Sequence, residues 1–417
     1  MEYAVNSYAE IKRLLSKNHP SYFWRCLMPI SNEEWDEAIR TSSKILTGDE
    51  RFFCSGAEDV IEYSLGEGYR GLQRWRLSPI HQILYLARPY IPQSLVAFLR
   101  RLYHRRPKPT FPLLWPKEDR YARFLWATMH QVLIRRGVKA AQHLDFWPHG
   151  KHFALVLTHD VETRMGHDFV RKLVALEESY GFRSSFNFVP ERYRVDSSLL
   201  VELKERGFEI GVHGLRHDGR LYASRKIFNE RARMINRYLS QWGAVGFRSP
   251  LTHRQPEWMQ ALEIEYDSSF CDTDPYETLA GGTMSLWPFF IGRFVELPYT
   301  LPQDHTLMIT LGEVTPRIWL EKVEFIAQFS GMALSITHPD YLHEPGRLNI
   351  YEQFLQTMSQ RKDYWHALPR DVACWWRNRA QFQPTWRDGV PDLSNLSGAT
   401  LTDVHVTDIT HFDMRNT

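Results

Sequence analysis

Residues 151–160, KHFALVLTHD, constrain the fold most strongly, because they form an uninterrupted apolar run that ends in polar residues. A run without polar alternation is typical of a strand buried on both faces, as in a parallel sheet. Residues 167–180 then place apolar side chains at helical spacing, and Gly181 follows as a natural helix stop. This order predicts a parallel β-strand with a covering helix.

The same order recurs further along the chain. Apolar runs predict strands at 183–189, 208–213, 244–248 and 332–338. Helical spacing marks 199–206, 224–240 and 316–329. Repeated strand–helix units imply a parallel sheet with right-handed crossovers. The chemistry is then expected at the carboxyl ends of the strands.

Three regions follow from these patterns. Residues 1–118 are predicted to be mainly helical and to end in a Pro-rich linker, 119–382 to form the main domain, and 383–417 to form a tail or a small β extension. An apolar-basic segment at 95–108 could contact a membrane surface or a phosphorylated glycan carrier, although a solvated helix face is the alternative. Its basic side chains are Arg100, Arg101, Arg105, Arg106 and Lys108.

Composition excludes several classes of protein. The formal net charge of +2 gives no basic excess for nucleic acid. The four cysteines lie far apart without a CxxC pair, so they are predicted to be free buried thiols. The first residues carry charges where a signal peptide needs an apolar run, and no stretch reaches the ~20 apolar residues of a membrane span. We therefore expect a cytoplasmic protein.

Two of the predicted strands end in groups that could bind a metal. Asp160 and Glu162, in THDVE, stand two residues apart and project to one side if the strand continues. His213 and His217, in HGLRH, stand four residues apart and are expected to share one face of a helical turn. Two imidazoles and a carboxylate can hold one divalent cation and leave open positions for water. A helix cap, a salt bridge or unrelated histidines are the alternatives.

Two more polar residues follow strands. Arg248 opens RSP after AVGF, where a guanidinium can hold a catalytic carboxylate. His338 closes MALSIT, and a histidine at a strand end can protonate a leaving amine. An ordinary salt bridge and a structural histidine are the alternatives. Four such sites, each at the end of a strand, together predict an active site.

These motifs resemble those of the polysaccharide deacetylases, the family with the NodB homology domain, also called carbohydrate esterase family 4. The resemblance covers about residues 150–375. The family motifs H-(S/T)-x-x-H and R-x-P are similar to 213–217 and 248–250, and L-x-I-x-x-H is similar to 334–338. THDVE matches the family branch that carries D-V-D. The resemblance implies an α/β fold, a distorted (β/α)7-type barrel.

The resemblance also implies roles for the residues. Asp160 would be the base and Glu162 the metal ligand with the two histidines, but Glu is longer than Asp, so Asp160 is an alternative ligand. Arg248 would fix Asp160, and His338 would be the acid. Gly214 departs from the usual Ser or Thr of the metal motif.

Further residues are assigned by similarity to the family's fourth region, here 266–290. Asp272 or Asp274 would polarise His338, with Asp304 as an alternative acid. Predicted substrate-binding residues are Trp287, Asp274 and Pro250.

The expected activity is hydrolysis of the N-acetyl group of an amino sugar, in a polysaccharide or in its lipid- or nucleotide-linked precursor, with a divalent metal, most simply Zn²⁺. One alternative is a cytosolic amidase on a small non-sugar amide, similar to an allantoinase. The other is a metal- or glycan-binding module without catalysis, against which the presence of base, ligands and acid argues. The sequence does not indicate an oligomeric state.

Overall fold

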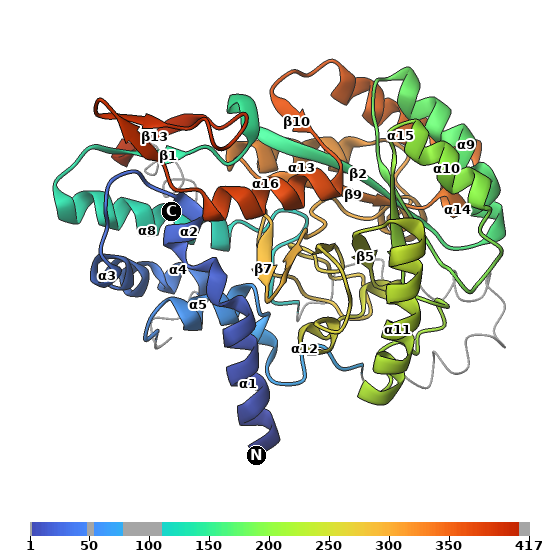
Figure 1. Cartoon of the computed structure of the whole chain (residues 1–417), viewed down its shortest axis with the longest axis horizontal. Coiled ribbons are helices and arrows are strands. Elements are labelled where there is room, and N and C mark those ends of the chain that lie inside the picture. The colour runs from blue at the N-terminus through green and yellow to red at the C-terminus, as the bar shows by residue number, and fades with distance from the viewer. Residues whose placement is uncertain (1, 48–53, 78–110, 408–417) are drawn as a thin grey trace.

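The computed structural model of the 417-residue chain describes residues 2–47, 54–77 and 111–407 (Figure 1). The basic segment at 95–108, predicted to contact a membrane or a glycan carrier, lies outside the described residues. No described helix is both long and apolar enough to cross a membrane.

A curled parallel sheet forms the centre of the molecule (Figure 1). Its strands, in spatial order, are β9 (Met332–Thr337), β2 (Phe153–Val161), β3 (Ser185–Phe188), β4 (Glu209–His213), β5 (Gly246–Arg248), β6 (Tyr266–Asp267) and β8 (Phe294–Glu296). The strand β10 (Tyr364–His366) pairs with the start of β2, and β7 (Phe289–Ile291) pairs antiparallel with β8. β2 is buried along its whole length, as its apolar run predicted.

Backbone hydrogen bonds close this sheet into a barrel. After β8 the chain stays extended, and Tyr299 N donates to Phe270 O at 2.9 Å. The next residues, Thr300 and Leu301, both donate their N–H groups to Leu334 O in β9, at 3.2 and 3.1 Å. Within the described residues, seven strands therefore surround one interior, and the predicted distorted (β/α)7-type barrel is confirmed.

Helices cover the outside of the barrel. Those that follow its strands are α9 (Arg164–Ser179), α10 (Ser197–Glu205), α11 (Arg225–Trp242), α13 (Arg317–Gln328), α14 (Pro339–Leu342), α15 (Pro345–Ser359) and α16 (Pro369–Gln381). The short elements η5 (Pro250–Thr252), α12 (Pro256–Met259) and η6 (His305–Leu311) lie in the connections. Ser224 caps the first turn of α11, and Gly243 ends that helix at a φ of 54°, so the sequence itself sets both helix boundaries.

The N-terminal region is helical, as predicted. Its described part contains α1 (Glu2–Leu15), η1 (Ser16–Asn18), α2 (Pro20–Trp24), α3 (Asn32–Ser42), α4 (Lys44–Thr47), α5 (Ala57–Ser64) and η2 (Gly68–Arg70). The helix α8 (Arg120–Arg136) follows, at the start of the predicted main domain. Asn18 joins the N-terminal region to β7, because its side chain donates to Phe290 O at 2.8 Å and accepts from Phe290 N at 2.7 Å. This region therefore packs directly on the barrel.

The last described residues form short β pairs beyond the barrel. These are β11 (Thr385–Arg387) with β12 (Val390–Asp392), and β13 (Leu401–His405) with β1 (Ala140–Leu144), while η4 (Pro148–Gly150) precedes β2. The β1–β13 pair lies beside α16 in Figure 1, away from the barrel interior. The expected small β extension is thus present, and the predicted domain boundaries remain a prediction.

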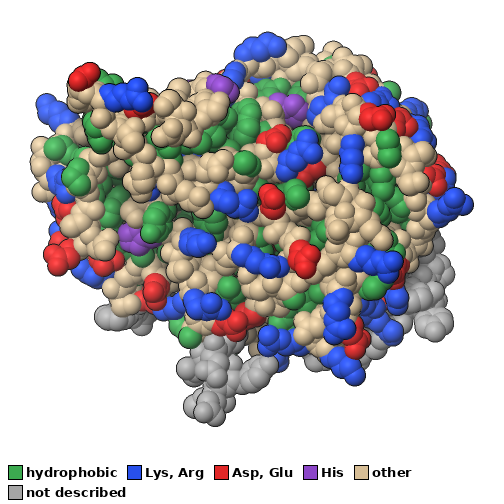
Figure 2. Space-filling view, viewed as in Figure 1, with side chains coloured by type: hydrophobic (Ala, Val, Ile, Leu, Met, Phe, Trp, Pro, Cys, Tyr) green, Lys and Arg blue, Asp and Glu red, His purple; other side chains and the backbone are tan. Residues whose placement is uncertain are grey.

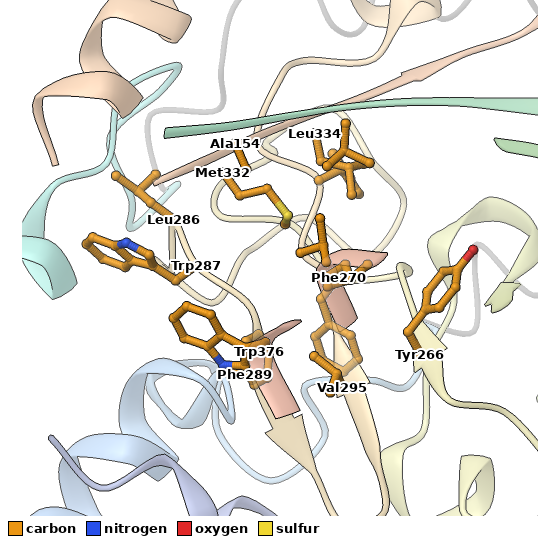
Figure 3. Close-up of a cluster of buried hydrophobic side chains, with 14 of the residues drawn as sticks. Ala154, Tyr266, Phe270, Leu286, Trp287, Phe289, Val295, Met332, Leu334 and Trp376 are labelled. Atoms are coloured by element: carbon orange, nitrogen blue, oxygen red, sulfur yellow. The ribbon is translucent and has the colours of Figure 1, made fainter. Parts of the chain in front are cut away.

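One hydrophobic core joins these parts. Figure 3 shows Leu286, Trp287, Phe289 and Trp376 beside Met332 at the start of β9. The surface, in contrast, mixes charges of both signs. On the described part of the face in Figure 2, Lys and Arg side chains alternate with Asp and Glu, so this face offers no continuous basic surface for nucleic acid.

Glu209, the first residue of β4, is a buried carboxyl group that should make stability depend on pH. The Tyr266 hydroxyl donates to its Oε1 at 2.7 Å, and Arg370 N donates to its Oε2 at 3.1 Å. Burial raises the pKa of Glu209 to about 7, from 4.5. The folded chain therefore keeps a proton that the unfolded chain releases, and stability falls as the pH rises through this range.

We expect the free energy of unfolding to decrease by about 3 kcal/mol between about pH 4 and about pH 8 because of this group. Glu209→Gln cannot ionise, so it should remove that part of the slope. Urea unfolding of both proteins at the two pH values measures the difference. Parallel pH profiles for the two proteins would contradict the assignment.

Candidate metal centre and active site

Glu162, His213 and His217 meet at the carboxyl ends of β2 and β4. One ligand atom from each lies within 4.8 Å of the other two. Glu162 Oε1 is 2.9 Å from His217 Nε2 and 4.0 Å from His213 Nε2. The two imidazole rings have their centroids 5.0 Å apart. The structure thus brings together the three residues predicted to bind a metal, although their ligand role stays a proposal.

The two histidines do not meet through a helical turn, and that expectation was wrong. His213 is the last residue of β4, and the residues after it form a loop. Gly214 and His217 both have left-handed backbone conformations, with φ of 62° and 52°. The loop reverses sharply at Gly214, and this reversal rather than a helical turn brings the His217 ring back towards His213.

The hydrogen bonds of His213 fit a metal ligand. Its Nδ1 lies 3.1 Å from the carbonyl oxygen of Arg248, and because a carbonyl only accepts, Nδ1 carries the proton. Burial lowers the pKa of His213 to about 4, so the ring is neutral at neutral pH. The lone pair is then on Nε2, which is buried and has no hydrogen-bond partner among the described residues. A bound cation would satisfy this atom, and two imidazoles with one carboxylate are a common zinc ligand set.

Glu162 is held as a carboxylate. Burial opposes its ionisation, but the nearby His217, His338 and His213 lower its pKa well below the usual value. Its backbone N donates to Asp340 Oδ2 at 2.9 Å, and the hydroxyl of Thr163 donates to the other oxygen of Asp340. The turn after β2 is therefore fixed by Asp340, to which we had assigned no role from the sequence.

Asp160 lies beside this group, two residues before Glu162 and within β2. Its Oδ1 accepts from Arg248 Nη1 at 3.0 Å and from Asn187 Nδ2 at 2.9 Å, while Oδ2 is 3.8 Å from His213 Nδ1. Burial opposes ionisation, but Arg248 and His213 lower the pKa of this carboxyl group. One oxygen of this carboxylate is thus anchored, and the other lies near the His213 ring.

Arg248 is itself held from two further sides. Its Nε and Nη2 donate to the backbone oxygen and the hydroxyl of Ser268, at 2.9 and 2.8 Å, and Nη1 also donates to Thr158 Oγ1 at 2.9 Å. The predicted contact between Arg248 and Asp160 is present. Sequence analysis missed Asn187, whose only signal was an amide residue inside the apolar strand β3.

His338 completes the group from the end of β9. Its Nε2 is 3.8 Å from Glu162 Oε1. Its Nδ1 is 2.7 Å from Asp304 Oδ1, and its backbone N donates to Asp304 Oδ2 at 2.7 Å. Burial lowers the pKa of His338, but Asp304 and the other carboxylates outweigh it and raise the pKa to about 10. His338 is therefore a cation at neutral pH in the metal-free chain.

Asp304 is the carboxylate that contacts His338. The sequence had offered it as the alternative to Asp272 or Asp274. Asp272 instead forms a buried ion pair with Lys322, and Asp274 accepts from the Tyr299 hydroxyl at 3.1 Å. Both carboxylates lie in the loop after β6, and each is engaged by its own partner outside that loop. Neither therefore makes the expected contact with His338.

Trp287 does not lie at this group, and we leave it out of the proposed site. Its Nε1 donates to Ser330 O at 2.8 Å, just before β9 begins, whereas His338 follows the other end of β9. Its ring stacks on Trp126 of α8, with centroids 5.6 Å apart (Figure 3 shows its place in the core). The tryptophan therefore belongs to the core at the amino end of the barrel.

Pro250 lies next to the histidine loop. A Cβ atom on Gly214 would stand 2.3 Å from Pro250 Cγ. No side chain fits at 214, which explains why this chain departs from the family pattern there. The proline is also buried, so its position supports a packing role more directly than the predicted contact with substrate.

Replacing Gly214 by Ala should disturb the metal centre. The variant must accept both an unfavourable φ of 62° and the clash with Pro250, which together cost about 3 kcal/mol of stability. Gly181→Ala is the matched control, because Gly181 has a φ of 79° but no atom within 4 Å of its Cβ position. We expect Gly214→Ala to lower the melting temperature more than the control and to bind Zn²⁺ more weakly, by calorimetry. Equal behaviour of both variants would contradict the steric argument.

Solved structures similar to this chain include two polysaccharide deacetylases and an allantoinase. A putative polysaccharide deacetylase from Mycobacterium smegmatis is 19% identical, covers 59% of this chain and 97% of its own, and has a TM-score of 0.48. A probable polysaccharide deacetylase from Pseudomonas aeruginosa is 18% identical over 57% and 95%, with a TM-score of 0.47. An allantoinase, Puue, is 16% identical over 57% and 94%, with a TM-score of 0.46.

No protein-family model and no curated protein matches the sequence. The case for a function therefore depends on the geometry of this chain's own residues.

Proposed function

We propose that this chain is a metal-dependent deacetylase that hydrolyses the N-acetyl group of an amino sugar. One observation carries the proposal: Glu162, His213 and His217 converge with their ligand atoms within 4.8 Å, between the carboxylate of Asp160 and the imidazole of His338. A ligand set flanked by a base on one side and an acid on the other is what hydrolysis of an amide requires.

The metal would be held by Glu162, His213 and His217, and Zn²⁺ fits this set best. When bound, a divalent cation lowers the pKa of a coordinated water from 15.7 towards ~7 and polarises the acyl oxygen.

Asp160 is suited to accept the proton of the attacking water. Arg248 and Asn187 occupy its Oδ1, so Oδ2 is the oxygen that faces the ligands and can take a proton. Arg248 keeps the carboxylate ionised before the reaction, since it lowers the pKa of Asp160. The water oxygen then forms a bond to the acyl carbon.

His338 is suited to release the product. Asp304 holds Nδ1, so Nε2 points towards the ligands and carries the proton to be donated. As the C–N bond breaks, this proton goes to the departing nitrogen. The products are acetic acid, which loses its proton to give acetate, and a free amine. Asp160 then releases the proton that it took from water, and His338 regains the proton that it gave.

The substrate class follows from the resemblance of the motifs to polysaccharide deacetylases. We propose an N-acetylated amino sugar in a polysaccharide or in its lipid- or nucleotide-linked precursor. A small non-sugar amide would need the same metal, base and acid, so the two substrates differ only in what surrounds the acyl group.

Hydrolysis of a panel of substrates tests the proposal, measured as acetate release from the acetylated sugars, formate release from the formyl amide and ring opening of allantoin. The panel contains nucleotide-linked, oligomeric and lipid-linked N-acetyl sugars, with allantoin and a formyl amide as non-sugar members. We expect release from at least one acetylated sugar by the Zn²⁺-loaded protein, its loss after chelation, and its return with added metal. Turnover of the non-sugar amides alone would overturn the substrate class. Metal binding without turnover of any member would favour a binding module.

A further inference from the structure

The turn that follows α5 in the N-terminal region contains a buried carboxylate. Glu67 is fully buried, and its Oε2 accepts from Arg70 Nη1 and from Trp75 Nε1, each at 2.9 Å. Its Oε1 accepts from Arg254, which is also buried and comes from the connection after β5. Breaking a buried ion pair leaves an uncompensated charge and is strongly destabilising. The pair of Glu67 and Arg254 therefore fixes the positions of the two segments relative to each other.

The connection that Arg254 ends is strained. Leu251 and Thr252 are consecutive non-glycine residues in the left-handed region, with φ of 60° and 50°. Such conformations persist only where the surroundings impose them. Arg254 supplies part of that constraint, because its Nη1 donates to Thr252 O at 3.0 Å and its guanidinium lies 4.9 Å from the ring centre of Phe270.

This connection and Arg248, the strand residue directly before it, contact the candidate metal centre at two places. The carbonyl oxygen of Arg248 accepts from His213 Nδ1 and so orients that ring. The ring of Pro250 occupies the space where a side chain at Gly214 would lie, and so supports the reversal between His213 and His217. A shift of residues 248–254 would therefore move both histidines.

We propose that Glu67 is a positioning residue of the metal centre. It acts through Arg254, which holds the strained connection, and the connection in turn orients His213 and supports the loop to His217. The N-terminal region is then part of the catalytic unit, not a separate helical module that precedes it. This inference rests on the proposed metal-binding function, and it adds a requirement that lies outside the resemblance at 150–375.

Cobalt binding tests the inference without any measurement of activity. Co²⁺ in place of Zn²⁺ reports both affinity, by titration, and ligand geometry, by its visible absorption. In the full-length protein we expect Glu67→Gln to weaken Co²⁺ binding by about tenfold, which is the lower end of the effect of outer-shell partners, and to shift the absorption band.

Glu62→Gln is the matched control. Glu62 is a buried carboxylate of the same region, and it pairs at 2.7 Å with Arg74, which belongs to that region rather than to the connection after β5. We expect this variant to lose thermal stability like Glu67→Gln but to keep the wild-type Co²⁺ affinity and spectrum. An equal loss of affinity in both variants would mean that general loosening is the cause, and would overturn the inference.

A second variant applies if Glu67→Gln does not fold. Arg254→Lys keeps the positive charge, but a single amine cannot reach both Glu67 and Thr252 O as the guanidinium does. We expect weaker Co²⁺ binding in this variant as well. Wild-type affinity in a folded Glu67→Gln or Arg254→Lys protein would refute the role of Glu67. Absence of Co²⁺ binding by the wild-type protein would instead refute the proposed metal centre.

Discussion

Asp160→Asn should lower kcat by about 10²–10⁴, the usual contribution of a general base, and leave the fold intact. Asn has the same shape as Asp and still offers an oxygen to Arg248 and Asn187, which contact Oδ1 at 3.0 and 2.9 Å. The amide cannot take a proton from water at neutral pH, so only the chemical step is lost. Steady-state rates of acetate release, beside a circular dichroism spectrum, measure both parts of this expectation.

Measurements of metal binding decide which of Asp160 and Glu162 is the metal ligand and which is the base, a choice that the sequence left open. The ligand group in the structure contains Glu162, whereas Asp160 has one oxygen engaged by Arg248. We therefore expect Asp160→Asn to bind Zn²⁺ within a few-fold of wild type and Glu162→Gln to bind it much more weakly. The opposite pattern would make Asp160 the ligand and Glu162 the base. Wild-type turnover by Asp160→Asn would remove it from the mechanism altogether.

The ends of strands were predictable because their position follows from the apolar pattern. Parallel strands bring their carboxyl ends to one edge, so polar residues directly after buried runs must meet there, whatever the lengths of the helices between them. This is why Glu162, His213 and His338 could be grouped from the sequence, and why Arg248 was expected next to Asp160. The structure places all of these residues at that edge.

Residues in loops were not predictable in the same way. Asp272, Asp274 and Asp304 are all carboxylates after strands, and nothing in local spacing indicates which one reaches His338. The choice depends on tertiary partners: Lys322 pairs with Asp272, which leaves Asp304 for the histidine. The sequence could not supply this, because those partners lie 34 and 50 residues away.

Contacts between the N-terminal region and the barrel were also not predictable from the sequence. Trp287 lies between the third and fourth motifs in sequence, but its ring stacks on Trp126, which belongs to the helix before the barrel. Glu67 lies in a stretch without any catalytic pattern, yet it is paired with Arg254 from the connection after β5. The error at Trp287 and the omission of Glu67 have one cause: both residues lie outside regular helices and strands, where local spacing does not show which surface a side chain packs against.

His338→Ala should also lower kcat by about 10²–10⁴, because the departing nitrogen would leave without a proton donor. Its Nε2 is directed at the ligand group, 3.8 Å from Glu162 Oε1, and does not belong to the three ligands themselves. Zn²⁺ affinity should therefore stay close to wild type. A variant with normal turnover, or one that has lost the metal, would contradict the role of acid.

Asp304→Asn tests how the acid is prepared. In the proposed mechanism the cationic form of His338 is the active one, so we expect activity to be lost as the pH rises through the pKa of this residue. Although burial lowers that pKa, the contact at 2.7 Å with Asp304 is the strongest influence that raises it. Asn removes the charge but can still accept from Nδ1, which keeps the ring in place. We expect the alkaline limb of the kcat profile to move to lower pH while the maximal rate changes less than in His338→Ala. An unmoved alkaline limb would show that a different group donates the proton to the amine.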